Sequence, residues 1–313
     1  MHNTKSNINF PNPNTDSLNL MDLRVDYAFK LLFAFDGTSR LISLLNAIFA
    51  NKGIPRTVKK LTIQNPNIEK QSKTDKYSIL DIKAELGDNS IVCIEMHLYG
   101  LKEFKHKSVR SWAKVYASRA KSGKRYKSNP VICISFINGA IKYADGSPVK
   151  KIHSVFEIAE RDEHKTLTND MEMHYINMKG FVKALNGKDY KTFETKPDMF
   201  TKWLAFITQK EIQNKEILEM LCKEEEFKVA AKTLALLSQD TIKRLEYERR
   251  QDEIAWHKMV VRQRKAADRR TEEAIRQKEE YARLIEEYAR QKEKADKEIA
   301  ELREKLRKFE ENA

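Results

Sequence analysis

The chain has 313 residues, 41% hydrophobic and 34% charged, so it is long enough for one sizeable core and an appended module. It carries 59 Lys and Arg against 46 Asp and Glu, and this net charge of +13 favours a polyanionic partner. The three cysteines show no CxxC spacing, which argues against a disulfide framework or a zinc ribbon and favours a cytoplasmic location. Neither a signal peptide nor an apolar run of about 20 residues is present, so no membrane association is expected.

The basic excess lies in the body of the chain and not in its C-terminal part. Of the basic residues, 21 lie from position 241 onward, and so do 18 of the acidic residues. The first 240 residues therefore hold an excess of ten basic residues, and we expect any nucleic-acid contact there.

Composition divides the chain into four parts. Residues 1–21 are rich in Asn and Pro and are expected to be disordered. Residues 22–185 alternate helical and strand patterns, which predicts an α/β domain with a mixed β-sheet flanked by helices. An all-helical region is expected over 186–250, followed by a long C-terminal helix with a coiled coil over 251–313.

Two helices open the α/β domain, because apolar residues recur at helical spacing after Asp22 and again after Thr38 and Ser39, either of which can cap the second helix. Strands are expected over 58–63, 79–85, 91–98, 130–137, 153–158 and 172–178. The second and third of these flank a GDNS turn and predict a hairpin. A basic amphipathic helix is expected over 101–122, and the run PVICISFI predicts a strand that is buried on both faces.

No glycine or proline follows Pro197, so the remainder of the chain is expected to be helical. From Val260 onward, mostly apolar residues recur every seven positions, and a second series is apolar at Ile285, Ile299 and Leu306 with Lys278 and Lys292 between. This pattern favours a coiled coil that is firmer near its end. The alternative is a single charged helix in solvent.

Acidic residues interrupt the predicted hairpin. Alternation along a strand places Asp81 on one face, and places Glu95 and His97 together on one face of the partner strand. Two nearby carboxylates repel each other unless a cation or a proton lies between them, and oxygen ligands favour Mg²⁺, or Mn²⁺ if an imidazole takes part. The alternative is a solvated strand face without a metal.

The motifs in their order resemble a known family. They are D-x-x-F-K at 26–30, SLLNAIF at 43–49, LDIKAE at 80–85, IEMH at 94–97 and S-G-x-x-Y at 122–126. Over residues 22–185 the chain resembles the PD-(D/E)XK nuclease superfamily, and more narrowly the recombination-promoting nuclease branch described as PD-(D/E)XK nuclease family transposase. The resemblance implies a restriction-endonuclease-like core.

The resemblance also implies site residues. Asp26, Asp81 and Glu95 correspond to the acids that bind Mg²⁺ and support catalysis in the family. His97 stands where the superfamily has Lys and this branch commonly has Gln; a neutral imidazole can position water or accept its proton, since its unperturbed pKa is about 6.5. The alternative for Asp26 is a first-turn acid that interacts with the helix dipole.

Basic residues near this site are candidates for DNA contact. Arg110 is the first, because the family has an Arg at that place, and Lys83, Lys107 and Lys114 are further candidates. Trp112, Tyr116 and Tyr126 can stack on bases, although aromatic residues at helical spacing are more often part of a core.

The sequence therefore predicts a Mg²⁺-dependent DNA endonuclease linked to recombination or mobile elements, which forms homo-oligomers through its coiled coil. One alternative is a catalytically weak or degenerate nuclease-fold protein that binds DNA and assembles through the coiled coil. Another is a structural protein dominated by its helical tail. The family label does not make the chain a DDE-type transposase, because the hairpin motif is of a different kind.

Overall fold

The computed structural model of the chain describes residues 20–35, 37–64, 67–68, 78–99, 103–119, 129–187, 197–213, 215–221 and 223–310. They form two units. One ends at Trp256 and the other begins at His257. The predicted S-G-x-x-Y motif at 122–126 lies outside the described residues.

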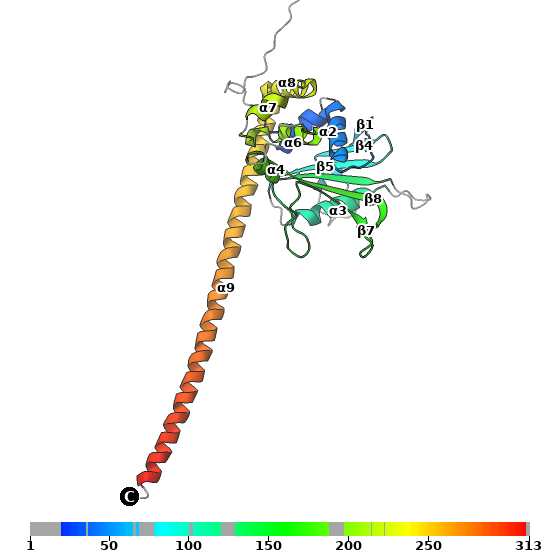
Figure 1. Ribbon diagram of the computed structural model, residues 1–313. Helices are drawn as coiled ribbons and strands as arrows, with labels where there is room; N and C mark the ends of the chain where they lie inside the picture. Colours follow the sequence, from blue (N-terminus) through cyan, green and yellow to red (C-terminus); the bar gives the residue numbers. More distant parts are fainter. Residues whose placement is uncertain are drawn as a thin grey trace, which may run out of the picture. The chain divides into compact units, whose positions relative to one another are not determined.

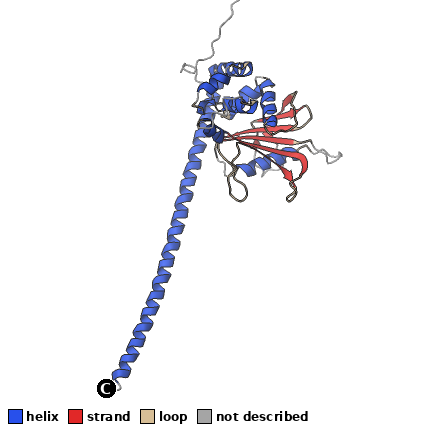
Figure 2. Cartoon of the chain, viewed as in Figure 1, coloured by secondary structure: helices blue, strands red, loops and turns tan. Residues whose placement is uncertain are grey.

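A six-stranded mixed sheet forms the centre of the first unit (Figures 1 and 2). Its strand order is β1-β4-β5-β6-β8-β7, with β5, β6 and β8 parallel to one another and the other pairs antiparallel. The strands are β1 (Leu61–Gln64), β4 (Ile82–Leu86), β5 (Ile91–His97), β6 (Val131–Ile137), β7 (His153–Ala159) and β8 (Thr166–Asn177). A short separate pair consists of β2 (Asn67–Ile68) and β3 (Ser78–Ile79). The predicted mixed α/β fold is confirmed.

The predicted hairpin joins β4 to β5 through the GDNS turn. The Asp88 carboxylate accepts hydrogen bonds from the Ser90 backbone N–H at 3.0 Å and from the Ser90 hydroxyl at 2.5 Å. Asn89 adopts a φ of 62°, a left-handed conformation that Asn tolerates well. The turn therefore fixes the register in which Ile82 lies opposite Ile94.

Helices cover both faces of the sheet (Figure 1). One face packs against α1 (Asp26–Lys30), the π-helix η1 (Leu31–Phe35), α2 (Ser39–Ala50) and α6 (Met199–Ile207), and the other against α3 (Phe104–Ala117). Every residue of β6 is buried, as predicted. Six of the seven residues of β5 are buried as well, so the strand face that carries Glu95 is covered by α3 and not left to solvent.

Some predicted boundaries differ from the observed ones. The helix expected over 101–122 is described from Phe104 to Ala117, and the strand expected over 172–178 begins at Thr166. The first half of β8 is mostly polar and exposed where it pairs with the edge strand β7, so no apolar alternation indicates it. Met21, within the segment expected to be disordered, is buried, and its N–H donates to the Ser238 hydroxyl.

Helix α4 (Met178–Leu185) follows the sheet. After Pro197, in agreement with the lack of glycine and proline there, the described residues form α6, the 3-10 helix η3 (Gln209–Glu211), α7 (Lys215–Leu221), α8 (Glu225–Gln239) and α9 (Thr241–Glu310). The first turns of α9 belong to the first unit, where Tyr247 and Ile254 are buried. From His257 onward α9 continues as a helix with most side chains exposed, and its pairing with another helix stays a prediction.

Within the described residues, no single helix combines the length and the apolar character needed to cross a membrane. Among these residues, one bent pair of helices, Asp26–Phe35 and Ser39–Ala50, meets the requirements of length and composition together.

A chain of polar side chains, in which His153 and His174 are buried, links β7 and β8 to the residue that follows α2. The Nδ1 atom of His153 lies 2.8 Å from the side-chain amide oxygen of Asn51, and its Nε2 atom lies 2.9 Å from His174 Nδ1. His174 Nε2 lies 2.6 Å from Glu172, which also accepts a hydrogen bond from Arg56 at 2.9 Å. Burial lowers the pKa of His153 to about 2, and the charges of His174 and Lys52 act in the same direction.

The low pKa of His153 predicts a loss of stability in acid. The unfolded chain binds a proton at His153 below pH 6.5, whereas the folded chain does not until about pH 2, so stability falls as the pH falls through this window. We expect the unfolding free energy of the wild type to fall faster than that of His153→Gln, by up to about 1.4 kcal/mol per pH unit below pH 6.5. Urea unfolding between pH 7 and pH 5 measures this difference. His106→Gln is the matched control because His106 is exposed, and equal pH profiles for wild type and His153→Gln would contradict the assignment.

Candidate active site

A pocket of about 120 Å³ lies at the C-terminal end of β5. Residues 95–99 form one side, and Asp26, Asp81, Lys107 and Arg250 complete much of the rest. In α/β sheets, ligands bind preferentially beyond the carboxyl ends of strands. The pocket therefore lies where the fold favours a ligand.

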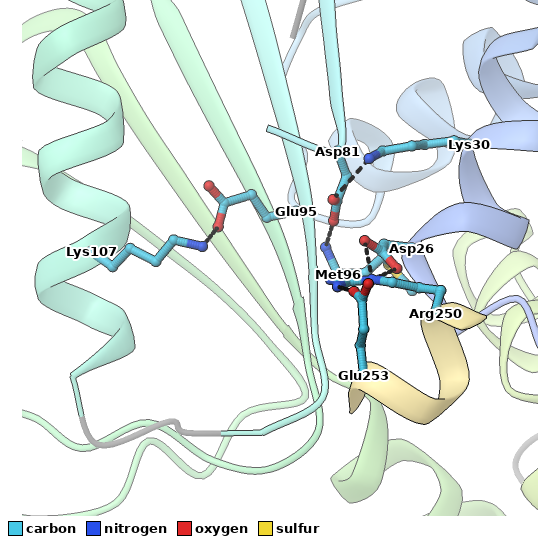
Figure 3. A network of polar contacts seen from close by, with 8 residues as sticks. All are labelled: Asp26, Lys30, Asp81, Glu95, Met96, Lys107, Arg250 and Glu253. Carbon is cyan, nitrogen blue, oxygen red and sulfur yellow. Dashed lines mark hydrogen bonds and ion pairs between the residues drawn. The ribbon is translucent and has the colours of Figure 1, made fainter. Parts of the chain in front are cut away.

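All three predicted acids line this pocket, and each forms an ion pair with a basic side chain (Figure 3). The Arg250 Nε lies 2.8 Å from Asp26 Oδ1 and 3.0 Å from Asp26 Oδ2. The other two pairs join Lys30 to Asp81 at 3.4 Å and Lys107 to Glu95 at 3.3 Å. Helices α9, α1 and α3 thus each supply one positive charge.

Asp81 occupies a bend immediately before β4, so strand alternation does not set its direction. Its Oδ2 accepts a hydrogen bond from the Met96 N–H at 2.5 Å, which ties it to β5. Burial raises the pKa of Asp81 to about 6; Asp26 and Glu95 add to this, while Lys30 and the Met96 N–H oppose it. The carboxylates of Asp26 and Glu95 therefore disfavour the ionised form of Asp81.

Glu95 points toward Lys107 on the α3 side of β5, as Figure 3 shows, while Asp81 and Asp26 lie toward α1 and α9. Its side chain is 9% exposed. Its Oε1 atom is buried and has no hydrogen-bond partner among the described residues. A buried carboxylate oxygen without a partner is costly, so this atom has free capacity for a cation or a donor.

Asp81 and Glu95 are the residues of the pocket that are best suited to bind a metal ion. Their oxygens are the ligand type that Mg²⁺ prefers, and Glu95 Oε1 is available to a ligand. Within the part of the chain that the structure describes, however, no group of three or more His, Cys, Asp and Glu side chains is arranged to hold a metal ion. Asp26 is engaged by Arg250 through both oxygens, so a cation that contacts all three acids requires this pair to open.

His97 also lines the pocket. Its ring stacks on Phe104 with centroids 4.0 Å apart and planes inclined by 23°, and Tyr99 lies 5.7 Å away. Phe104 is the first residue of α3, so the contact joins the end of β5 to the helix that carries Lys107. The imidazole therefore lines the same pocket as the three acids.

The predicted DNA-contacting residues occupy different surroundings. Lys107 lies in the pocket, and Arg110 is exposed about one turn further along α3. Lys114 is half-buried on the same helix, and Lys83 is half-buried on β4 between Gln64 and Cys93, away from the pocket. Trp112 and Tyr116 stack on each other, and the Trp112 indole donates to the Val131 carbonyl, so both serve packing.

The basic partners of the acids were not predicted as such. Lys30 is part of the D-x-x-F-K motif and lies one helical turn after Asp26, a spacing that indicates a shared face. Lys107 was assigned only to DNA. Arg250 lies 224 residues from Asp26, and no local pattern indicates their contact.

Comparison with known proteins identifies one family. The family model described as PD-(D/E)XK nuclease family transposase matches residues 23–264. No curated protein and no solved structure gives a significant match.

Proposed function

Because the chain belongs to the PD-(D/E)XK nuclease family transposase group, we propose that it is a metal-dependent DNA endonuclease that acts in recombination or on mobile elements. The observation that supports this proposal most is the gathering of Asp26, Asp81 and Glu95 in one pocket beside His97. The proposed cofactor is Mg²⁺, with Mn²⁺ as a substitute.

In the proposed mechanism, Asp81 and Glu95 hold the metal ion. The ion, when bound, supplies charge stabilisation at the scissile phosphate and a lowered pKa for water. His97 lies beside these acids and positions the attacking water or accepts its proton. Metal binding needs the ionised form of Asp81, which its pKa of about 6 provides at neutral pH.

DNA contact is proposed for the basic side chains of α3. Lys107 borders the pocket, and the exposed Arg110 can bind a neighbouring backbone phosphate. Lys107 now pairs with Glu95, and it would be available to phosphate if a cation were held by that carboxylate in its place. Lys114 and Lys83 are proposed as weaker phosphate contacts.

A second candidate is a catalytically weak or degenerate nuclease that binds DNA. Two observations favour it. Each acid already has a basic partner, and His97 replaces the Lys or Gln of the family. In this form, the basic side chains would serve binding, and the pocket would not turn over substrate.

A plasmid-nicking assay with Mg²⁺, Mn²⁺ or EDTA separates the two candidates. We expect metal-dependent nicking of supercoiled DNA by the wild type, and a loss of about 10³-fold or more in Asp81→Ala and Glu95→Ala, because a lost metal site removes several kcal/mol of transition-state stabilisation. Glu85→Ala is the matched control, since Glu85 lies on β4, bonds to Gln64 and does not line the pocket. If the pocket variants nick DNA as well as the control does, the assignment of the site is wrong.

His97→Gln tests the role of the imidazole in the same assay. The substitution moves the sequence toward the branch pattern and removes the stacking on Phe104. We expect nicking activity to be retained or increased, with a weaker dependence on pH between 6 and 8, because Gln does not titrate. Complete loss of activity with an unchanged melting temperature would show that the imidazole is chemically required.

Self-association through the C-terminal part of α9 is the last part of this proposal. An exposed apolar stripe runs along this part of the helix, with side chains between 48% and 71% exposed. Its members are three or four residues apart, except for one gap of eleven residues: Tyr281, Ile285, Tyr288, Ile299, Leu302 and Leu306. Such a stripe is typical of a helix that pairs with a second copy of itself. Two copies would also supply two pockets for cutting both strands.

Two paired substitutions on α9 test self-association in the full-length chain. Ile285→Glu with Leu302→Glu places charges on the stripe, and we expect light scattering to show a smaller mass than for the wild type. Ala289→Glu with Ala300→Glu is the matched control, which adds the same charge off the stripe and is expected to leave the mass unchanged. An equal mass for wild type and both variants would contradict pairing along this stripe.

A further inference from the structure

Asp26 forms the shortest ion pair among the three acids of the pocket. Arg250 contacts both of its oxygens, whereas Lys30 and Lys107 each approach one carboxylate oxygen at 3.3 Å or more. Arg250 also contacts Glu253 at 2.5 Å. Although burial lowers the pKa of Arg250, its pairs with Asp26 and Glu253 raise it overall, so the guanidinium stays charged.

Arg250 reaches the pocket from a packed face of helix α9 and not from a loop. Tyr247, Arg250 and Ile254 follow one another at three and four residues on α9 and therefore share one face. Tyr247 and Ile254 are buried, and the Tyr247 hydroxyl accepts a hydrogen bond from the Asp22 N–H at 2.9 Å. Gln251 donates to the same hydroxyl at 2.8 Å. The start of α9 is thus fixed against the segment that leads into α1 and Asp26.

We propose that Arg250 is a positioning residue of the metal site, which competes with a divalent cation for the Asp26 carboxylate and thereby sets the cation affinity of the pocket. The Arg250 Nε–H group contacts both Asp26 oxygens and therefore weakens the interaction of this carboxylate with a metal ion. The inference rests on the proposed function, because it requires that a cation binds among these acids.

Titration of the full-length protein with Mn²⁺ by isothermal calorimetry, without nucleic acid, tests the inference. Arg250→Met keeps much of the aliphatic stem and removes the charge. We expect it to bind Mn²⁺ about tenfold more tightly than the wild type or better, because charge-assisted hydrogen bonds to Asp26 no longer compete. Arg249→Met is the matched control: Arg249 is 71% exposed and pairs with Glu246, and its replacement is expected to leave the affinity unchanged.

A double-mutant cycle separates action through Asp26 from a general effect of charge. In the Asp26→Asn background, we expect Arg250→Met to change the affinity by less than about threefold, since the competing carboxylate is gone. Arg250→Lys keeps the charge but loses the two-oxygen contact, and an affinity between those of the wild type and Arg250→Met is expected.

Three outcomes would overturn the inference. They are an unchanged or weaker Mn²⁺ affinity in Arg250→Met with an intact melting temperature, an effect of equal size in the Asp26→Asn background, and an equal effect of Arg249→Met. Loss of Mn²⁺ binding in Asp81→Asn and Glu95→Gln, together with wild-type affinity in Arg250→Met, would reject the role of Arg250 and leave the proposed function standing. Absence of Mn²⁺ binding in the wild type and in every variant would reject both.

Discussion

Three carboxylates can share one small pocket only if positive charge is supplied beside each of them. Removing a carboxylate from water is costly unless it is paired, and like charges at close range raise that cost further. In this protein, Lys30, Lys107 and Arg250 supply the charge. Because they lie on α1, α3 and α9, three helices contribute to the charge balance at the end of β5.

Much of the sheet could be predicted because its core strands bury both faces. Apolar and β-branched runs indicate β5 and β6 directly, and the GDNS turn indicates how β4 and β5 pair. The first half of β8 could not be found in this way, since it is polar, exposed and paired with an edge strand. The sequence thus predicts buried strands better than strands held only by backbone hydrogen bonds to a neighbour.

The acids that line the pocket could be found from the sequence, but the basic side chains that pair with them could not. Asp81, Glu95 and His97 line one pocket because a hairpin brings them to the same end of the sheet. Alternation along a strand places Glu95 on the same face as His97, and in the structure α3 covers this face. It does not apply to Asp81, which precedes the strand and is held by the Met96 N–H. The contact of Asp26 with Arg250 depends on the packing of α9, and no spacing within the sequence encodes it.

The residues matched by the family model include every residue that lines the pocket, from Arg24 to Ile254. The exposed apolar stripe of α9 lies beyond the match, which ends at 264. The first turns of α9 are therefore part of the unit that carries the acids, although they belong by sequence to a long charged helix. A boundary drawn at the end of the sheet would separate Asp26 from its partner and leave a nearly buried carboxylate without a countercharge. For the same reason, the described pocket is complete only when the chain is taken as far as Ile254.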